Sequence, residues 1–213
     1  MLGIVTLNSF LAVVLRMASD TIRVVGICGS LRQESYTRVA LGRALDAAKR
    51  AGATVELLDL REYELPTFDA DVDRTDAGDA EALSTRVRDA DAIVLASPVY
   101  HGSYASPLKT ALDYCGFDEF GEKTVGLLAV AGGAFPVMAL DHMRAVCRSL
   151  NAWVLPHEAA ISTSRQAFEN GTFVDDDLEE RVATLGRHVV QYARIEPGQH
   201  SFESDQNVGA RGK

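Results

Sequence analysis

The sequence predicts an α/β fold in which a five-stranded parallel sheet is covered by helices on both faces. Apolar runs rich in β-branched residues alternate five times with stretches whose apolar residues have helical spacing. These runs also lack the period-2 alternation of apolar and polar residues that marks a strand with one wet face. Each strand is therefore expected to be buried on both faces, as in a parallel sheet between two helical layers.

The expected strands and helices alternate along the whole central part of the chain. The strands are expected at residues 22–28, 54–60, 91–98, 124–130 and 152–161. The helices are expected at residues 35–50, 79–88, 107–114, 136–150 and 175–195. In the first of these helices, Leu41, Leu45 and Ala48 form the inner stripe, and Arg38 and Lys49 lie largely away from it.

Composition excludes several classes of partner. A chain of 213 residues suits one domain with a sizeable core. Its net charge of -9 argues against nucleic acids and anionic membranes as partners. Only four of its 21 basic residues are lysines, and this acid-rich, lysine-poor composition is typical of halophilic proteins.

The cysteines and histidines show no pattern of a disulfide framework or a metal site. Cys28, Cys115 and Cys147 are odd in number and contain no CxxC pair. The five histidines have no HExxH or similar ligand spacing. A reducing, cytoplasmic location fits this cysteine usage best.

One domain is expected over residues 21–196, with a further segment at each end. Residues 197–213 are polar and are expected to be disordered. The apolar run within residues 1–20 lacks the basic start of a signal peptide and is too short to span a bilayer. Two accounts of it stay open: translation that begins at Met17, which we favour, and an added packing helix.

Ligands of such sheets bind outside the carboxyl ends of the strands, where the strand order reverses, so the following loops are the candidate sites. The loop "GSLRQESYTR" follows the first strand and leads into a helix whose first N–H groups are free to bind an anion. Ser30, Ser35 and Thr37 can add hydroxyl donors, and Arg32 can add a charged fork of N–H groups. The alternative gives Ser35 only an N-cap role and leaves Arg32 in solvent.

The same loop matches neither of two well-known phosphate loops. It has no GxxxxGK[ST] pattern, which excludes an ATPase loop, and "GICGSL" does not match the GxGxxG of dinucleotide sites. A mononucleotide phosphate held by hydroxyls and one arginine is the interpretation that is left.

The loop "SPVYHGSYASPLK" after the third strand is a candidate site for a planar ring. Pro98 fixes the exit of the chain from the sheet, and Gly102 permits close approach of a flat ligand. Tyr100, His101 and Tyr104 offer faces or edges to an aromatic ring. The alternative is a structured loop whose tyrosines pack on the surface.

The loop "AVAGGAFPVM" after the fourth strand contains Gly132 and Gly133, which allow backbone N–H groups to face a ligand. Its alternative is a tight turn before a helix with an unoccupied N-terminus. Together, the three loops describe a slot for one phosphate and one planar ring. Flavin mononucleotide (FMN) has that shape.

These motifs resemble those of the NADPH-dependent FMN reductase family, which includes flavodoxin-like quinone, chromate and azo-dye reductases. "GSLRQESYTR" is similar to its GSLRxxSxN[RG]-like phosphate loop, and "PVYHGSYASPLKTALD" to its P-x-Y-[NH]-G…LKNA-[IL]-D stretch. The resemblance spans about residues 22–194. Thr37 and Thr110 stand where asparagine is common, and Val99 stands where glutamate is frequent.

The resemblance implies a flavodoxin-like three-layer sandwich with strand order 2-1-3-4-5. It also implies that FMN carries the chemistry, so that no catalytic side chain is expected. Carried over to this sequence, the phosphate ligands would be Ser30, Arg32, Ser35 and Thr37. The flavin ring would meet Pro98, Val99, Tyr100, His101 and Gly102, with Gly132 and Gly133 behind it.

The activity that the resemblance implies is hydride transfer from NADPH or NADH to N5 of FMN and then to a small acceptor: a quinone, free flavin, chromate or an azo compound. It further implies a homodimer or homotetramer. The alternative function is a flavodoxin-like electron carrier that binds FMN and serves a protein partner. A noncatalytic redox sensor or scaffold is a third hypothesis, against which the intact first loop argues.

Overall fold

Five parallel strands form the central sheet of the protein, which we describe for residues 21–194 from a computed structural model. They are β1 (Arg23–Cys28), β2 (Thr54–Asp59), β3 (Ala92–Tyr100), β5 (Thr124–Val130) and β6 (Trp153–Ile161). Their order is β2-β1-β3-β5-β6, and the short strand β4 (Ser103–Tyr104) pairs antiparallel with the end of β3. The predicted fold class and the strand order 2-1-3-4-5 are thereby confirmed. The predictions for residues 1–20 and 197–213 lie outside the described residues.

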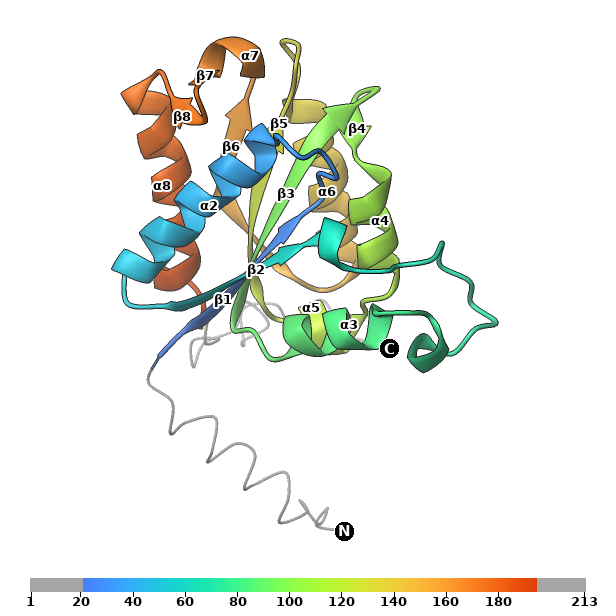
Figure 1. Cartoon of the computed structure of the whole chain (residues 1–213). Helices are drawn as coiled ribbons and strands as arrows, with labels where there is room; N and C mark the ends of the chain where they lie inside the picture. Colours follow the sequence, from blue (N-terminus) through green and yellow to red (C-terminus); the bar gives the residue numbers. More distant parts are fainter. Residues whose placement is uncertain (1–20, 195–213) are drawn as a thin grey trace, which may run out of the picture.

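Helices cover both faces of this sheet (Figure 1). One face carries α2 (Tyr36–Arg50) and α8 (Asp176–Gln191). The other face carries α3 (Ala80–Arg88), α4 (Ser106–Asp113) and α6 (Val137–Ser149).

Several short elements were not predicted, because each is too short to show a periodic pattern. They are η1 (Leu60–Glu62), η2 (Arg74–Asp76), α5 (Phe117–Phe120), α7 (Ser164–Ala167), β7 (Phe168–Glu169) and β8 (Thr172–Phe173).

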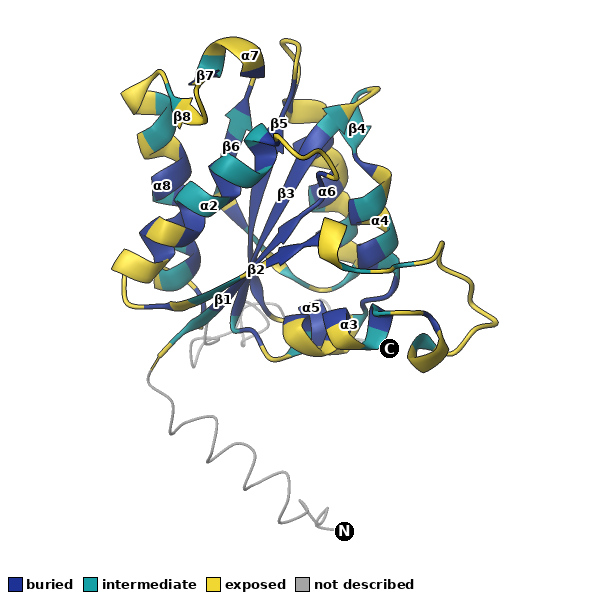
Figure 2. Cartoon of the chain, viewed as in Figure 1, coloured by how far each residue is buried: buried dark blue, intermediate teal, exposed yellow. Residues whose placement is uncertain are grey.

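The alternating side chains of the central strands enter two separate cores, one under each helical layer. In β1, Val24 and Cys28 belong to the core under α2 and α8, whereas Val25 and Ile27 belong to the opposite core. All four residues are buried. Figure 2 shows the central strands of the sheet mostly in the colour of buried residues. This packing explains why the strands read as continuous apolar runs.

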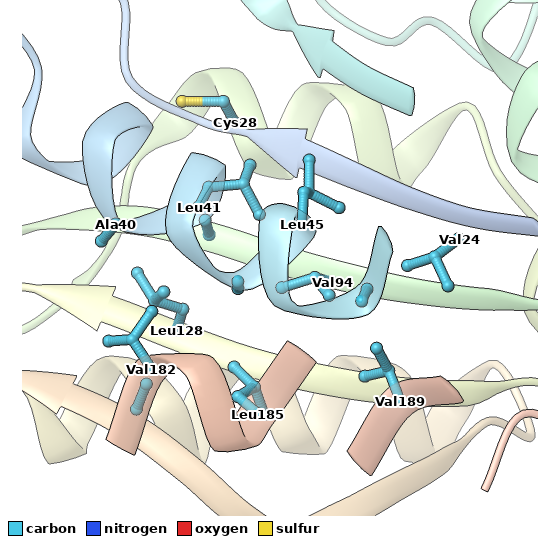
Figure 3. Packing of buried hydrophobic residues seen from close by; sticks show 14 of the residues in the cluster. Val24, Cys28, Ala40, Leu41, Leu45, Val94, Leu128, Val182, Leu185 and Val189 are labelled. Atoms are coloured by element: carbon cyan, nitrogen blue, oxygen red, sulfur yellow. The ribbon is translucent and has the colours of Figure 1, made fainter. Parts of the chain in front are cut away.

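The helices α2 and α8 pack over the first core so closely that their backbones are in contact. Leu41 and Leu45 of α2 and Leu185 of α8 point toward the sheet (Figure 3). A Cβ atom on Gly186 would lie 1.9 Å from the carbonyl oxygen of Ala44, so only glycine allows this approach.

The strand order reverses at β1, which has β2 on one side and β3 on the other. The helix after β1 packs on one face of the sheet, and the helix after β2 packs on the opposite face. The carboxyl ends of β1 and β3 therefore form the switch point of the sheet, which is the place where ligands of such sheets bind.

Candidate cofactor site

The loop that follows β1 lies directly against β3 and α4. The backbone N–H of Gly29 donates to the carbonyl oxygen of Ala96 at 2.8 Å. A Cβ atom on Gly29 would lie 2.8 Å from the Cβ of Leu108. Because Gly29 has no side chain, the loop can pack directly against β3 and α4, which any larger residue would prevent.

Two buried residues, one in this loop and one at the start of α2, carry hydroxyl groups that have no protein partner. Ser30 and Thr37 are each 2% exposed, and neither side-chain oxygen has a hydrogen-bond partner within residues 21–194. Among the described residues, Arg88 Nε is the one fully buried polar side-chain atom without a partner, so these two hydroxyl oxygens reach the surface. Each hydroxyl is therefore free to donate to a ligand.

Ser35 and Arg32 complete the polar set that the sequence predicts. The Ser35 Oγ accepts from the backbone N–H of Arg38 at 3.2 Å, which is the N-cap role that we gave as the alternative. Its hydroxyl hydrogen is still able to donate to a ligand. The Arg32 side chain is exposed and forms no ion pair with any described residue. The four side chains gather at one helix N-terminus and suit a phosphate dianion.

Arg38 is a functional candidate that our sequence interpretation missed. It was expected to lie away from the core, but its Nε donates to the Asp59 Oδ2 at 2.6 Å. Its Nη atoms donate to the carbonyl oxygens of Gln33 at 3.0 Å, Arg32 at 3.1 Å and Ser30 at 3.3 Å. The available signal was positional, because Arg38 closes the phosphate-loop motif and Asp59 ends the neighbouring strand.

Asp59 is the anchor of this arginine and of a second one. The residue is 4% exposed and accepts from Arg61 Nη2 at 2.6 Å, while Arg61 Nη1 donates to the side-chain oxygen of Gln33 at 2.6 Å. Burial opposes ionisation of the Asp59 carboxyl, but the hydrogen bonds from Arg61 and Arg38 outweigh it and lower its pKa. Asp59 is therefore a charged anchor at neutral pH.

The cysteines contribute no reactive thiolate near the loop. Cys28, Cys115 and Cys147 are buried and unpaired. Burial raises the pKa of Cys28, at the end of β1, above its ordinary value. It raises the pKa values of Cys115 and Cys147 to about 12. All three thiols stay protonated at neutral pH.

The loop after β3 is a tight β-hairpin, which the sequence did not predict. Both of its central residues have positive φ, 52° at His101 and 79° at Gly102. The Ser97 Oγ accepts from the backbone N–H of Ala105 at 2.8 Å and ties the hairpin to β3. Gly102 is thus required first by the turn, rather than by close approach of a ligand.

The aromatic side chains of this hairpin differ in their exposure. Tyr100 is 51% exposed and His101 is exposed at the turn. Val99 and Tyr104 are half-buried and pack against the core under α4 and α6. Pro98 is buried at the end of the sheet. Tyr100 and His101 are the side chains of the hairpin best placed to meet a ring from the solvent side.

The loop after β5 carries Gly132 and Gly133 in an open position. A Cβ atom on either glycine would have no heavy atom within 4 Å, and neither glycine has positive φ. The carbonyl oxygen of Gly133 accepts from the backbone N–H of Thr163 at 2.9 Å, which anchors the loop. The space beside these glycines is free, so the backbone is accessible to a ligand.

The three loops lie side by side because they follow adjacent strands. The second loop also lies against the start of α6, which follows the third loop. A Cβ atom on Gly102 would lie only 3.3 Å from the Cε of Met138. His142 Nδ1 lies 3.0 Å from the Ser103 Oγ across the same boundary. The predicted site residues therefore lie at one edge of the sheet, because the carboxyl ends of β1, β3 and β5 are neighbours there. Figure 1 shows these strand ends at the same edge.

A hollow of about 530 Å³ lies away from this edge. Its lining includes Phe68 and Val72 of the long loop and Phe117 of α5, and none of the predicted cofactor residues belongs to it. The described helices include none that is long and apolar enough to cross a membrane.

Comparison with known structures places the fold. The structure is similar to the apo form of an NADH:FMN oxidoreductase, with a TM-score of 0.66, 23% identity, and coverage of 83% of this chain and 92% of that one. It is also similar to an NAD(P)H:(acceptor) oxidoreductase of Paracoccus denitrificans, with a TM-score of 0.68, 18% identity, and coverage of 81% and 97%. These likenesses establish the flavodoxin-like α/β fold.

Comparison of sequences places the family. The family model described as NADPH-dependent FMN reductase matches residues 22–166. The chain is 31% identical over 182 residues to an FMN-dependent NADPH-azoreductase of Staphylococcus saprophyticus, covering 82% of this chain and 96% of that protein. A Staphylococcus aureus protein of the same description is 29% identical over 181 residues, with the same coverage. The chain therefore belongs to the NADPH-dependent FMN reductase family.

Proposed function

We propose that this protein is an FMN-containing oxidoreductase that passes a hydride from NADPH or NADH to a small acceptor. Membership of the family supports the requirement for FMN and a nicotinamide. The observation that carries the proposal is the pair of hydroxyl groups of Ser30 and Thr37, which have no hydrogen-bond partner within residues 21–194 and reach the surface at the start of α2. When bound, FMN would supply the redox chemistry at its N5 atom.

The phosphate is assigned to the first loop. Ser30, Ser35 and Thr37 would donate from their hydroxyls, and Arg32 would supply a charged fork. The first N–H groups of α2 would add unsatisfied donors and the positive end of the helix dipole. Because these groups come from one short loop, they would bind a terminal phosphate and leave the ring to the neighbouring loops.

The ring is assigned to the hairpin after β3 and the glycine loop after β5. Tyr100 and His101 would cover the exposed side of the ring, beside the backbone of Pro98, Val99 and Gly102. Gly132 and Gly133 would lie behind it, where no Cβ atom fills the space. No side chain of this set is assigned a proton-transfer role, since the hydride chemistry resides in the flavin.

The acceptor is assigned to the class of small molecules: a quinone, free flavin, chromate or an azo compound. Similarity to two proteins described as azoreductases supports an azo dye as the first acceptor to assay. The net charge of -9 favours a small acceptor over nucleic acid. We also propose that the protein works as a homodimer or homotetramer, which analytical ultracentrifugation would test.

The test combines cofactor binding with turnover. The purified protein is expected to bind FMN and to oxidise NADPH or NADH when an acceptor is present. Arg32→Ala should raise the Kd for FMN about tenfold or more, because a charge-assisted contact to the phosphate is lost. The matched control is Arg50→Ala, which removes an exposed arginine from the opposite end of α2 and should leave the Kd unchanged.

Three results would each contradict a part of the proposal. Absence of FMN binding by the wild-type protein would exclude the cofactor site, and an unchanged Kd in Arg32→Ala would exclude the phosphate assignment. FMN binding with slow NAD(P)H oxidation and a stable one-electron-reduced state would instead identify an electron carrier.

A further inference from the structure

The carbonyl groups of the phosphate loop point inward to one guanidinium group. Arg38 donates to the carbonyl oxygens of Ser30, Arg32 and Gln33 at 3.0 to 3.3 Å. Three carbonyls of a four-residue stretch are thus held on one side of the loop by a single side chain. This arrangement has a direct consequence for the N–H groups of the same peptide units.

A trans peptide unit has its C=O and N–H bonds in opposite directions. The partners of the three held carbonyls are the N–H groups of Leu31, Gln33 and Glu34, which therefore point away from Arg38. None of these N–H groups has a hydrogen-bond acceptor among the described residues. A row of outward N–H groups in a short loop forms a concave donor set that suits an anion.

Asp59 fixes the guanidinium that imposes this arrangement. Its carboxylate, 5% exposed, accepts from Arg38 Nε at 2.6 Å and from Arg61 Nη2 at 2.6 Å. Arg61 in turn donates to the side-chain oxygen of Gln33, so the loop is held at its backbone and at one side chain. Neither anchor residue needs to touch the ligand in this arrangement.

We propose that Asp59 and Arg38 form a positioning pair that presets the phosphate loop, so that the N–H groups of Leu31, Gln33 and Glu34 face the cofactor phosphate. The proposal rests on the proposed function, because it takes FMN as the ligand of the loop. Asp59 holds Arg38, Arg38 holds the loop carbonyls, and the loop presents its N–H groups without further ordering cost on binding.

The first experiment compares the affinities of Asp59→Asn for FMN and for riboflavin, which has the ring but lacks the phosphate. The Kd for FMN should rise about tenfold, and the Kd for riboflavin should stay within about twofold. The control is Glu56→Gln on the same strand, because Glu56 also pairs with two arginines, Arg23 and Arg86, but holds no loop carbonyl. It should change neither Kd.

A double variant tests whether the two residues act as a unit. Arg38→Lys keeps a positive charge but cannot span Asp59 and three carbonyls, so it should lose FMN affinity by a similar factor. Combining it with Asp59→Asn should lose little more than either single variant. Additive losses, or equal losses for FMN and riboflavin, would overturn the proposal.

The last experiment needs no cofactor, so it separates this proposal from the proposed function. Trypsin can cleave after Arg32 only when the loop opens, and the cleavage rate reports the open population. In FMN-free protein, cleavage after Arg32 should be several-fold faster in Asp59→Asn than in the wild type or Glu56→Gln. An unchanged rate would overturn the preset loop, whereas a wild-type protein that does not bind FMN would overturn the proposed function alone. If Asp59→Asn fails to fold, Arg38→Lys is measured in its place.

Discussion

Asp59 and Glu119 are both buried carboxylates that hold two arginines, but they lie at opposite ends of the sheet. Asp59 ends β2 at the carboxyl edge, where the three candidate loops lie. Glu119 lies in α5, beside the other edge (Figure 1), and binds Arg74 and Arg88. The exposed fractions of the two residues are 4% and 2%.

The two clusters differ in the groups that accept hydrogen bonds from the remaining N–H groups of their arginines. Arg38 and Arg61 hold the backbone and side chain of an otherwise exposed loop. Arg74 holds Glu81 of α3 and the carbonyl oxygen of Tyr114 at the end of α4. The same chemistry therefore holds the loop of residues 30–33 at one end and joins short helices at the other.

The largest effect on stability is expected from Glu119→Gln. The substitution leaves Arg88 without its carboxylate partner, and it weakens the acceptor of the Gly116 N–H. Because both arginines are about one-third exposed, solvent reduces the loss to about 2 kcal/mol in the free energy of unfolding, measured with urea. The ratio of FMN and riboflavin affinities should not change.

The exposed pair of Glu180 and Arg187 supplies the control for that measurement. Glu180→Gln should leave the midpoint of urea unfolding unchanged. If Glu119→Gln were as stable as the wild type, or if it lowered the affinity for FMN specifically, the contrast between the two clusters would be lost.

A smaller effect, on ligand affinity and not on stability, is expected from Ser30→Ala and Thr37→Val. Each variant removes one hydroxyl that has no protein partner within residues 21–194, so the folded protein loses no hydrogen bond. The Kd for FMN should rise about tenfold in each, and the Kd for riboflavin should not change. Isothermal titration calorimetry with both ligands measures this difference. Equal affinities of variant and wild type for FMN would remove that hydroxyl from the phosphate site.

Acid should weaken both clusters over the same range of pH. Burial raises the pKa values of Asp59 and Glu119, but hydrogen bonds outweigh it, from Arg61 and Arg38 in one case and from Gly116 and Arg88 in the other, so both values are lowered. The stability that each carboxylate contributes is complete above its unfolded pKa of about 4 and is lost as the pH falls through the lowered value. The difference in stability between the wild type and Asp59→Asn or Glu119→Gln should therefore shrink below about pH 4. A difference that stays constant down to pH 3 would contradict this assignment.

The smallest effect is expected at His188, which lies outside both clusters. Burial, His157 and Arg187 lower the pKa of His188, and its ring lies 5.3 Å from that of His157. The neutral ring is favoured in the folded state, so the protein should lose a little stability as the pH falls below about 6.5. His188→Gln should show a smaller loss over that range in thermal unfolding, and an identical pH profile would exclude this contribution.

The sequence predicted the strands and the loops at their carboxyl ends well because their signals are local. Runs such as "IRVVGIC" show burial on both faces without further information, and the loops after them follow directly. Ser30, Tyr100 and Gly132 could be predicted to lie at one edge, because the carboxyl ends of parallel strands lie on the same side of a sheet. The assignment of these residues to FMN stays a prediction.

The hairpin after β3 was missed because its two-residue turn depends on φ rather than on a recognisable Asn-Gly or Asp-Gly pair. Arg38 was misplaced for a different reason. Helical periodicity says which face of α2 is apolar, but it does not say that the start of this helix lies beside the end of β2.

The sequence by itself determined the five-stranded α/β fold and the three loops at its carboxyl edge, because apolar periodicity and loop motifs lie within short stretches of chain. Only the tertiary structure decided that Asp59, 21 residues after Arg38, holds that arginine under the phosphate loop. It also decided that α2 and α8 meet at Gly186. Both are contacts between elements separated along the chain, and their energies depend on burial and geometry that exist only once the sheet has assembled.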